Sequence, residues 1–151
     1  EQAFAGNSVI EHDFLKPICT RIARRLFSML QAGYLPRVDN VPFIEWDRRE
    51  LNTLADHAAN VALDQDQDWQ HDHVHEILAH PECTWRLCID GARRGSGEAS
   101  AGMALIAHLA DGIEQVVRRA GKRIGSLKSA FVAEVIALEW GLDHLCSFLH
   151  V

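Results

Sequence analysis

Residues 49–63 read RELNTLADHAANVAL, and this stretch decides the fold more than any other part of the chain. We predict a helix over residues 52–63, because its alanines recur on one face at helical spacing, where small side chains allow close packing. Those alanines are Ala55, Ala58, Ala59 and Ala62. Asn52 stands where an amide side chain caps a helix, at a gain of about 1 kcal/mol. Asp56 follows one turn later, so an acid lies near the start of a helix built to pack.

Helical and strand-like patterns alternate on both sides of this stretch. Apolar residues at four-residue steps predict a helix over residues 9–30, with a break or kink at Pro17. Before the Ala-rich helix we expect the end of a strand at residues 1–6 and a short strand at 41–46. After it we expect a polar, acidic linker at 64–84 with a short helix over 73–80, strands at 85–89 (ending in Asp90-Gly91), 101–109 and 113–120, and a helix over 126–149.

Length and composition indicate one soluble domain. The 151 residues, 48% of them hydrophobic, suffice for one core and are too few for two ordinary domains. No stretch approaches 18 uninterrupted apolar residues, so we expect neither a transmembrane helix nor a membrane partner. The start at Glu1, without Met, indicates a piece of a larger context. The four cysteines form no C-x-x-C pair and have apolar neighbours, which favours buried free thiols in the cytoplasm or nucleus.

Three acids stand where they could act together. Asp90 ends an apolar strand, Glu134 lies among apolar residues of the last helix, and Asp56 lies in the Ala-rich helix. An acid on a packed helix is costly to bury unless it is paired or bound to a metal ion. Carboxylate oxygens are hard ligands that suit Mg²⁺ or Mn²⁺. The alternative is an exposed helix face and a turn aspartate, because spacing alone does not show that the three converge.

Two of these stretches resemble the ribonuclease H domain of the plant and retroelement type. Residues 133–142 read AEVIALEWGL, similar to the family's Ala-Glu-x-x-Ala-Leu-x-x-Gly-Leu helix, and they follow a strand ending in Asp90-Gly91-Ala92. Residues 49–63 are similar to the family's final Arg-x-x-Asn-x-x-Ala-Asp-x-x-Ala-Asn-x-Ala-Leu segment. Residues 1–30 look like the piece between these halves, a strand ending in Asp-Ser and then a helix, with Asn7 in place of the Asp.

The order of the two halves is rotated relative to that family. Residues 85–151 look like its first half and residues 1–63 its second half, with the linker at 64–84 between them in a single domain over 1–151. The resemblance implies an α/β ribonuclease H-like fold, a five-stranded mixed sheet flanked by helices. The chain is either a circular permutant or one period of a tandem array, which would complete itself as a homodimer by exchanging halves with a second copy.

The resemblance also implies a site and an activity. In the family four carboxylates hold two Mg²⁺ ions at the scissile phosphate of the RNA strand in an RNA–DNA hybrid, and Mn²⁺ can replace Mg²⁺. Carried onto this chain, the four positions are Asp90, Glu134, Asn7 and Asp56. Asp90 would bridge both metals, Glu134 would hold the one near the leaving group, and Asp56 the one that activates water. Gly91, Ala92 and Asn52 would contact substrate, and Arg48, Arg49, Arg93 and Arg94 would contact phosphates.

Asn7 is the departure from the family's pattern. An amide supplies one neutral oxygen where a carboxylate supplies charge, so metal affinity and rate should both fall. Three interpretations stay open: a substitution that lets substrate bind without being cut, a natural inactive domain kept for binding or architecture, or an alignment in which Asp13 serves instead. The paired Asn residues that read 2′-hydroxyls in bacterial members are also missing, since Ala130 and Phe131 stand there.

Three functions therefore compete. The first is a ribonuclease H, impaired or inactive here because of Asn7. The second is a catalytically dead ribonuclease H-like module that binds or scaffolds within a larger assembly or a retroelement polyprotein. The third, a 3′–5′ exonuclease or integrase, is disfavoured by the motif at 49–63. A separate histidine cluster offers a zinc site whose spacing fits no zinc motif well, with a solvated linker as the alternative. It consists of His71, His73, His75 and His80, with Cys83 close by.

Overall fold

The computed structural model describes residues 2–34, 52–73, 84–110 and 112–151, with side chains of the first helix from residue 13 onward. In chain order the elements are α1 (Gln2–Gln31), α2 (Thr53–Gln65), β1 (Trp69–Asp72), β2 (Thr84–Arg93), β3 (Glu98–His108), β4 (Glu114–Ser126) and α3 (Ala130–Leu149). The predicted Ala-rich helix, the three meandering strands and the last helix are confirmed, although β4 runs on to Ser126, so that α3 begins later than expected.

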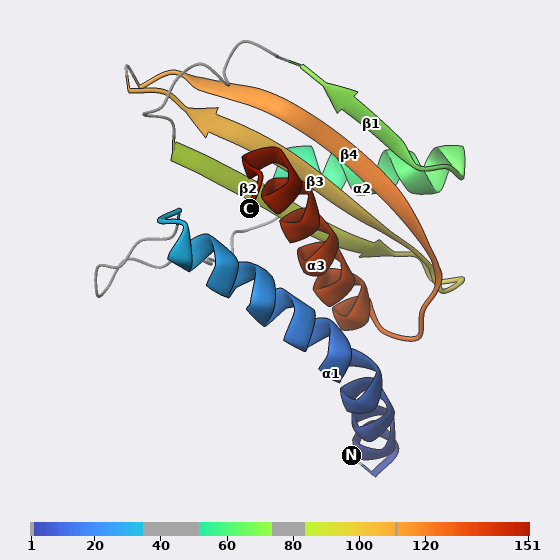
Figure 1. Cartoon of the computed structure of the whole chain (residues 1–151). Coiled ribbons are helices and arrows are strands. Elements are labelled where there is room, and N and C mark those ends of the chain that lie inside the picture. Colours follow the sequence, from blue (N-terminus) through green and yellow to red (C-terminus); the bar gives the residue numbers. More distant parts are fainter. Residues whose placement is uncertain (1, 35–51, 74–83, 111) are drawn as a thin grey trace.

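The strands form one sheet in the order β1-β4-β3-β2 (Figure 1). Every strand pair in the described part of the chain is antiparallel. The predicted α/β class is thus confirmed, whereas the described sheet has four antiparallel strands rather than five in a mixed arrangement. The strand expected at residues 41–46, and the short helix expected over 73–80 beyond His73, lie outside the described residues.

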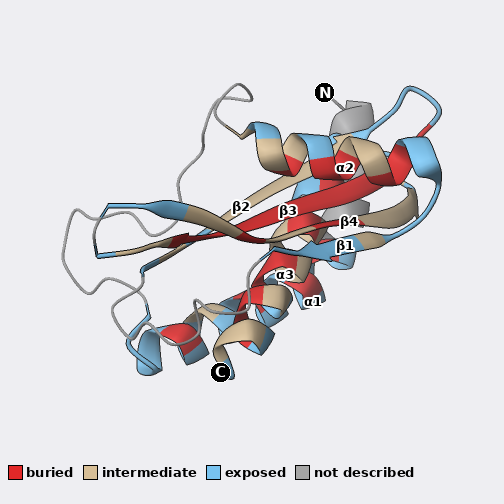
Figure 2. Ribbon diagram, turned by 90° about the horizontal axis from the view of Figure 1, so that it is seen from above, coloured by how far each residue is buried: buried red, intermediate tan, exposed pale blue. Residues whose placement is uncertain are grey.

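Helices cover both faces of this sheet, and small residues in β3 let them approach. Seen along the sheet, α2 lies on one face, and α3 and α1 lie on the other (Figure 2). β3 is buried along almost its whole length, with Ala99, Ala101, Ala104 and Ala107 fully inaccessible. The main core lies on the α3 side, where apolar residues of α1, α3 and the central strands pack together. They include Leu15, Ile18, Ile22, Met103, Leu105, Leu142 and Leu145.

The N-terminal segment corrects one prediction. Residues 2–6 were expected to end a strand, but α1 is helical from Gln2, with Pro17 inside it rather than ending it. Ala3, Ala5 and Gln2 favour helix, and no described strand lies beside them to compete. The ribbon of α1 changes direction within its N-terminal half (Figure 1). Pro17 has no N–H and so cannot make the hydrogen bond to the preceding turn. Asn7 therefore lies within a helix.

The segment expected to be a linker contains β1, which pairs with β4. Two long-range contacts explain why this polar stretch is ordered. The indole Nε1 of Trp69 donates to the Ala58 carbonyl oxygen at 3.0 Å, and the Arg118 guanidinium pairs with Asp72 at 2.7 Å. Neither contact is visible in local hydrophobic periodicity, so the pattern of residues 64–84 indicated a linker.

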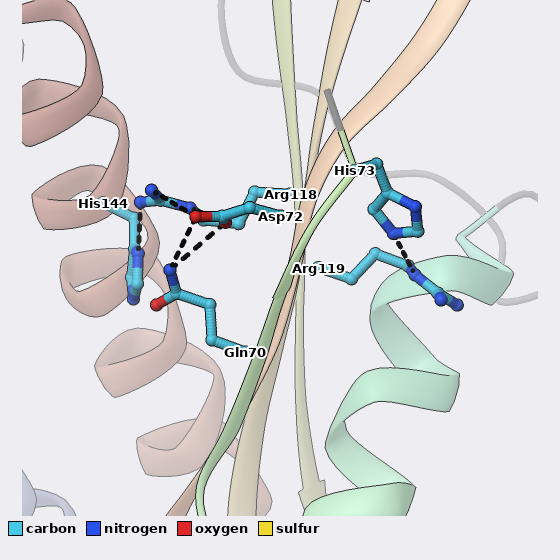
Figure 3. Close-up of polar contacts among 6 residues, drawn as sticks. All are labelled: Gln70, Asp72, His73, Arg118, Arg119 and His144. Atoms are coloured by element: carbon cyan, nitrogen blue, oxygen red, sulfur yellow. Dashed lines mark hydrogen bonds and ion pairs between the residues drawn. The ribbon is translucent and has the colours of Figure 1, made fainter. Parts of the chain in front are cut away.

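Arg118 also ties β1 to the second half of α3. Its Nη1 donates to Nδ1 of His144 at 3.3 Å, and its guanidinium carbon lies 5.7 Å from the ring centre of Phe148 (Figure 3). Burial, and then the neighbouring Arg118, lower the pKa of His144 below its usual 6.5. His144 can accept this hydrogen bond only while it is neutral.

We expect this contact to make stability depend on pH in a defined window. Because the pKa of His144 is lower in the folded chain than in the unfolded one, the unfolded state binds more protons there as pH falls through about 6.5. The free energy of unfolding should therefore decrease as pH falls from about 6.5 toward the folded-state pKa. Urea unfolding at several pH values should show a shallower decrease in His144→Gln than in the exposed-site control His57→Gln. Equal slopes in the two variants would contradict the role of His144.

Candidate functional site

The first half of the candidate site is the start of α2, which is fastened to β2. The side-chain Nδ2 of Asn52 donates to the carbonyl oxygen of Ile89 at 2.7 Å. The Asn52 side chain makes no capping hydrogen bond to α2, so the predicted capping role is wrong. The backbone N–H of Asp56 donates to the Asn52 carbonyl oxygen at 3.1 Å, which sets Asp56 one turn into the helix beside the same strand.

The second half is the start of α3, which contacts the same strand through a glycine. A Cβ on Gly91 would lie 2.5 Å from the carbonyl carbon of Ala133 and 2.6 Å from the backbone nitrogen of Glu134. No larger residue fits there, because real Cβ atoms do not approach so closely. The backbone of Gly91 is therefore in contact with the backbone of Ala133 and Glu134, although 42 positions separate Gly91 from Ala133.

The structure thus places Asp90 in β2, the backbone of Glu134 against the neighbouring Gly91, and Asp56 one turn after Asn52, which is bonded to Ile89 of the same strand. Asp90 lies opposite Gly102 in β3, and a Cβ on Gly102 would meet Ala59 of α2, so the Asp90 side chain leaves the sheet on the α2 face. Glu134 belongs to α3 on the other face and is exposed. β2 is an outer strand of the described sheet, so these two acids lie on opposite faces of an edge strand.

Asn7 is not brought to this place. The N-terminal end of α1 projects away from the sheet (Figure 1), and the Asn7 side chain lies outside what the structure describes. Asp13, the alternative fourth ligand, is an exposed residue of α1. Arg48 and Arg49, expected to contact phosphates, lie outside the described residues.

Arg93, the last residue of β2, and Arg94, directly after it, both make contacts that hold the β2–β3 hairpin in place. Nε of Arg93 donates to the Leu127 carbonyl oxygen at 2.7 Å and so ties the β2–β3 turn to the segment before α3. Arg94 forms an ion pair with Asp64 near the end of α2. Ala92, the third expected substrate contact of this strand, pairs with Ser100 in β3. Arg93 and Arg94 therefore have structural partners that their sequence position did not predict.

The chemistry of the three carboxylates matches Mg²⁺ or Mn²⁺, but their described arrangement does not yet form a metal site. Among residues 13–34, 52–73, 84–110 and 112–151, no three His, Cys, Asp or Glu side chains are grouped so that they could hold an ion. Asp90 and Glu134 lie on opposite faces of the sheet, which accounts for this. The described residues alone therefore do not fit a bound metal.

A second polar cluster, which sequence analysis missed as a unit, lies on β1 and β4. Nε of Arg119 donates to Nε2 of His73 at 2.9 Å, and its guanidinium carbon lies 6.0 Å from the ring centre of Trp69 (Figure 3). The rings of His71 and His73 are 4.3 Å apart. The alternation of Trp69, His71 and His73 could have indicated one face of a strand. His75, His80 and Cys83 of the suggested zinc cluster lie outside the described residues.

Comparisons with known proteins identify no relative. No family model, no curated protein and no solved structure matches the chain. In the part of the chain that is described, no helix is long and apolar enough to cross a membrane.

Proposed function

We propose that this chain is a ribonuclease H-type domain that binds RNA–DNA hybrids and whose cleavage of the RNA strand is impaired by Asn7. The observation that carries the proposal is the meeting of two motifs at one strand: Asn52 of α2 bonds to Ile89, and Gly91 touches the backbone of Glu134. These are the contacts expected if the two resembling stretches belong to one site, because each motif supplies one acid beside Asp90.

The proposal assigns roles to this chain's residues. Asp90, Glu134 and Asp56 would supply the carboxylates of the site, and to hold Mg²⁺ or Mn²⁺ together Asp90 and Glu134 would have to approach each other around the edge of β2. Gly91 would keep α3 close enough for Glu134 to reach the edge of β2. Residues 2–8 would have to leave α1 and lie along that edge, which has no strand neighbour in the described sheet, before Asn7 could take part.

We further propose that the rotated order is a circular permutation within one chain. The α1 and α2 helices come from residues 1–65, and they pack on α3 and on the sheet built from residues 69–126 of the same chain. Among the described residues, these contacts are all made within one chain. The mass in solution is therefore expected to be that of one chain, measured by light scattering or sedimentation. An obligate dimer would support exchange of halves instead.

A second candidate function is favoured by the helical state of residues 2–31 and by Asn7 itself. A module that binds the hybrid without cutting it, inside a larger assembly or a retroelement polyprotein, needs no fourth carboxylate. The two candidates share the hybrid as ligand and differ in whether the fourth acid restores cleavage.

A hybrid-cleavage assay separates these candidates. The unaltered chain and Asn7→Asp are each incubated with an end-labelled RNA–DNA hybrid in Mg²⁺ and in Mn²⁺, and hybrid binding is measured in parallel without divalent metal. Cleavage gained in Asn7→Asp supports the nuclease. Binding by both chains without cleavage in either metal supports the non-cleaving module. Neither binding nor cleavage overturns both.

A further inference from the structure

The face of the sheet that α2 covers extends beyond the start of that helix. α2 begins where Asn52 bonds to Ile89 and ends near the ion pair of Asp64 with Arg94, and between these ends it packs on Gly102 of β3 and Gly121 of β4, so it covers the sheet from the row of Ile89 onward. At about 1.5 Å per residue its 13 residues span about 20 Å, which matches six strand residues. Rows of the sheet before Ile89 therefore lie past the N-terminal end of α2.

One such row of residues, paired across all four strands, includes Arg119 of β4 and His71 of β1. Across the sheet, Cys88 pairs with Ala104, Ala104 with Arg119, and Arg119 with His71. Alternate residues of a strand share a face, and Trp69 reaches Ala58 of α2, so His71 and His73 also lie on the α2 side. Figure 3 shows His73 and Arg119 on that side of the sheet, opposite Arg118 and His144. We call Trp69, His71, His73 and Arg119 the β1–β4 patch.

The patch carries positive charge that no described carboxylate neutralises. The neighbouring arginines of β4 are held by acids: Arg118 by Asp72, and Arg123 by Asp66 at 3.2 Å. Arg119 has no carboxylate partner among the described residues; a histidine nitrogen and an indole ring hold it instead. Burial lowers the pKa of His73, and the neighbouring His71 and Arg119 lower it further, while the nearby Asp72 opposes them more weakly.

The position of the patch relative to Asp90 follows from the sheet register. Asp90 pairs with Gly102 and Gly102 with Gly121, so Asp90 lies two strands from β4, and Arg119 lies two residues along that strand. With strands about 4.8 Å apart and about 3.4 Å per residue, the two Cα atoms are about 12 Å apart.

We propose that the β1–β4 patch contacts the phosphodiester backbone of the nucleic acid at a second point, about 12 Å from Asp90. This inference rests on the proposed function and extends it to a second contact point. The guanidinium of Arg119, fixed against Trp69, offers its Nη donors, and the exposed imidazoles of His71 and His73 add N–H donors. Contacts of this kind position a duplex and are independent of its sequence.

Salt-dependent binding tests this contact. The dissociation constant of a short RNA–DNA hybrid is measured without divalent metal at about 50 to 200 mM salt for the unaltered chain, Arg119→Gln and the control Arg24→Gln. Arg24 is an exposed arginine of α1, on the other side of the sheet. Arg119→Gln should lower the slope of log affinity against log salt by about 1. Across this fourfold range its affinity should then change about 3.5-fold less than that of the control.

Additional variants and measurements distinguish failure of the patch proposal from failure of the nuclease proposal. Arg119→Lys keeps the charge and should keep the slope, and thermal unfolding shows whether each variant is folded. The same slope in Arg119→Gln and Arg24→Gln overturns the patch, even if Asn7→Asp cleaves the hybrid. An Arg119-dependent slope without any cleavage leaves the patch standing while the nuclease proposal fails. An Arg119-dependent response of the His73 NMR signals to inorganic phosphate alone, with no oligonucleotide binding, also overturns it as a nucleic-acid contact.

Discussion

An Asn7→Asp variant is expected to cleave the RNA strand of an RNA–DNA hybrid more than about 100-fold faster than the unaltered chain. The physical reason is charge: the amide of Asn7 leaves the proposed site one negative charge short against divalent cations. Loss of groups that only support a metal ligand typically costs about 10–100-fold in metal affinity or activity, and a direct ligand should cost more. Initial rates with end-labelled hybrid, at several Mg²⁺ concentrations, measure the effect.

Two matched variants show whether the gain belongs to this site. Asn7→Ala changes the same position without adding charge and should gain nothing. Asn7→Asp/Asp90→Asn keeps the new carboxylate but removes the proposed bridging one, and it should lose the gain; this also reveals any contaminating nuclease, which would cleave regardless of Asp90. Equal rates for Asn7→Asp and Asn7→Ala would show that residue 7 is no part of a metal site. Its position in α1, away from the sheet, would then be the reason.

The parts of the fold that were predicted correctly are those whose sequence carries its own periodic pattern or a recognisable motif. The β2–β3–β4 meander and the Ala-rich helix α2 show their burial in their own periodicity, because alternate or helically spaced residues face one layer. β1 was not predicted, since Trp69–Asp72 has little apolar alternation and is held by contacts made far away in sequence. Asp72 meets Arg118 across 46 positions, and no local pattern reports such a pairing.

The candidate site shows the same division. The neighbourhood of Asn52, Asp90 and Glu134 was expected from two motifs, and the structure brings their backbones to one stretch of β2. The roles of Arg93 and Arg94 were not foreseen, because a basic pair in a turn has the same composition whether it contacts phosphate or braces a hairpin. The short, mixed segment at residues 1–6 was expected to end a strand, but residues 2–6 begin α1, because so short a segment carries too weak a local pattern to distinguish the two.

The close packing of α2 on Gly102 of β3 makes Gly102→Ala the substitution with the largest expected loss of stability. A Cβ on Gly102 would run into the carbonyl oxygen of Ala55 and the backbone nitrogen of Ala59, and backbone atoms held in a helix cannot move aside like a flexible side chain. Gly102→Ala should therefore destabilise the chain by more than about 4 kcal/mol, a large share of the 5–15 kcal/mol typical of a domain. At about 2–4 °C per kcal/mol, the melting temperature should fall by about 10 °C or more, or the chain should not fold.

Gly95→Ala is the matched control, because a Cβ there meets nothing within 4 Å and its φ is not positive. It should change the free energy of unfolding by no more than about 1 kcal/mol. If Gly102→Ala melts at the same temperature as Gly95→Ala, then α2 does not rest on β3 as described. Asn52 and Asp56 would then have no fixed place beside Asp90. The same pair of variants therefore tests the packing of α2 on β3, and with it the geometry on which the proposed hybrid site depends.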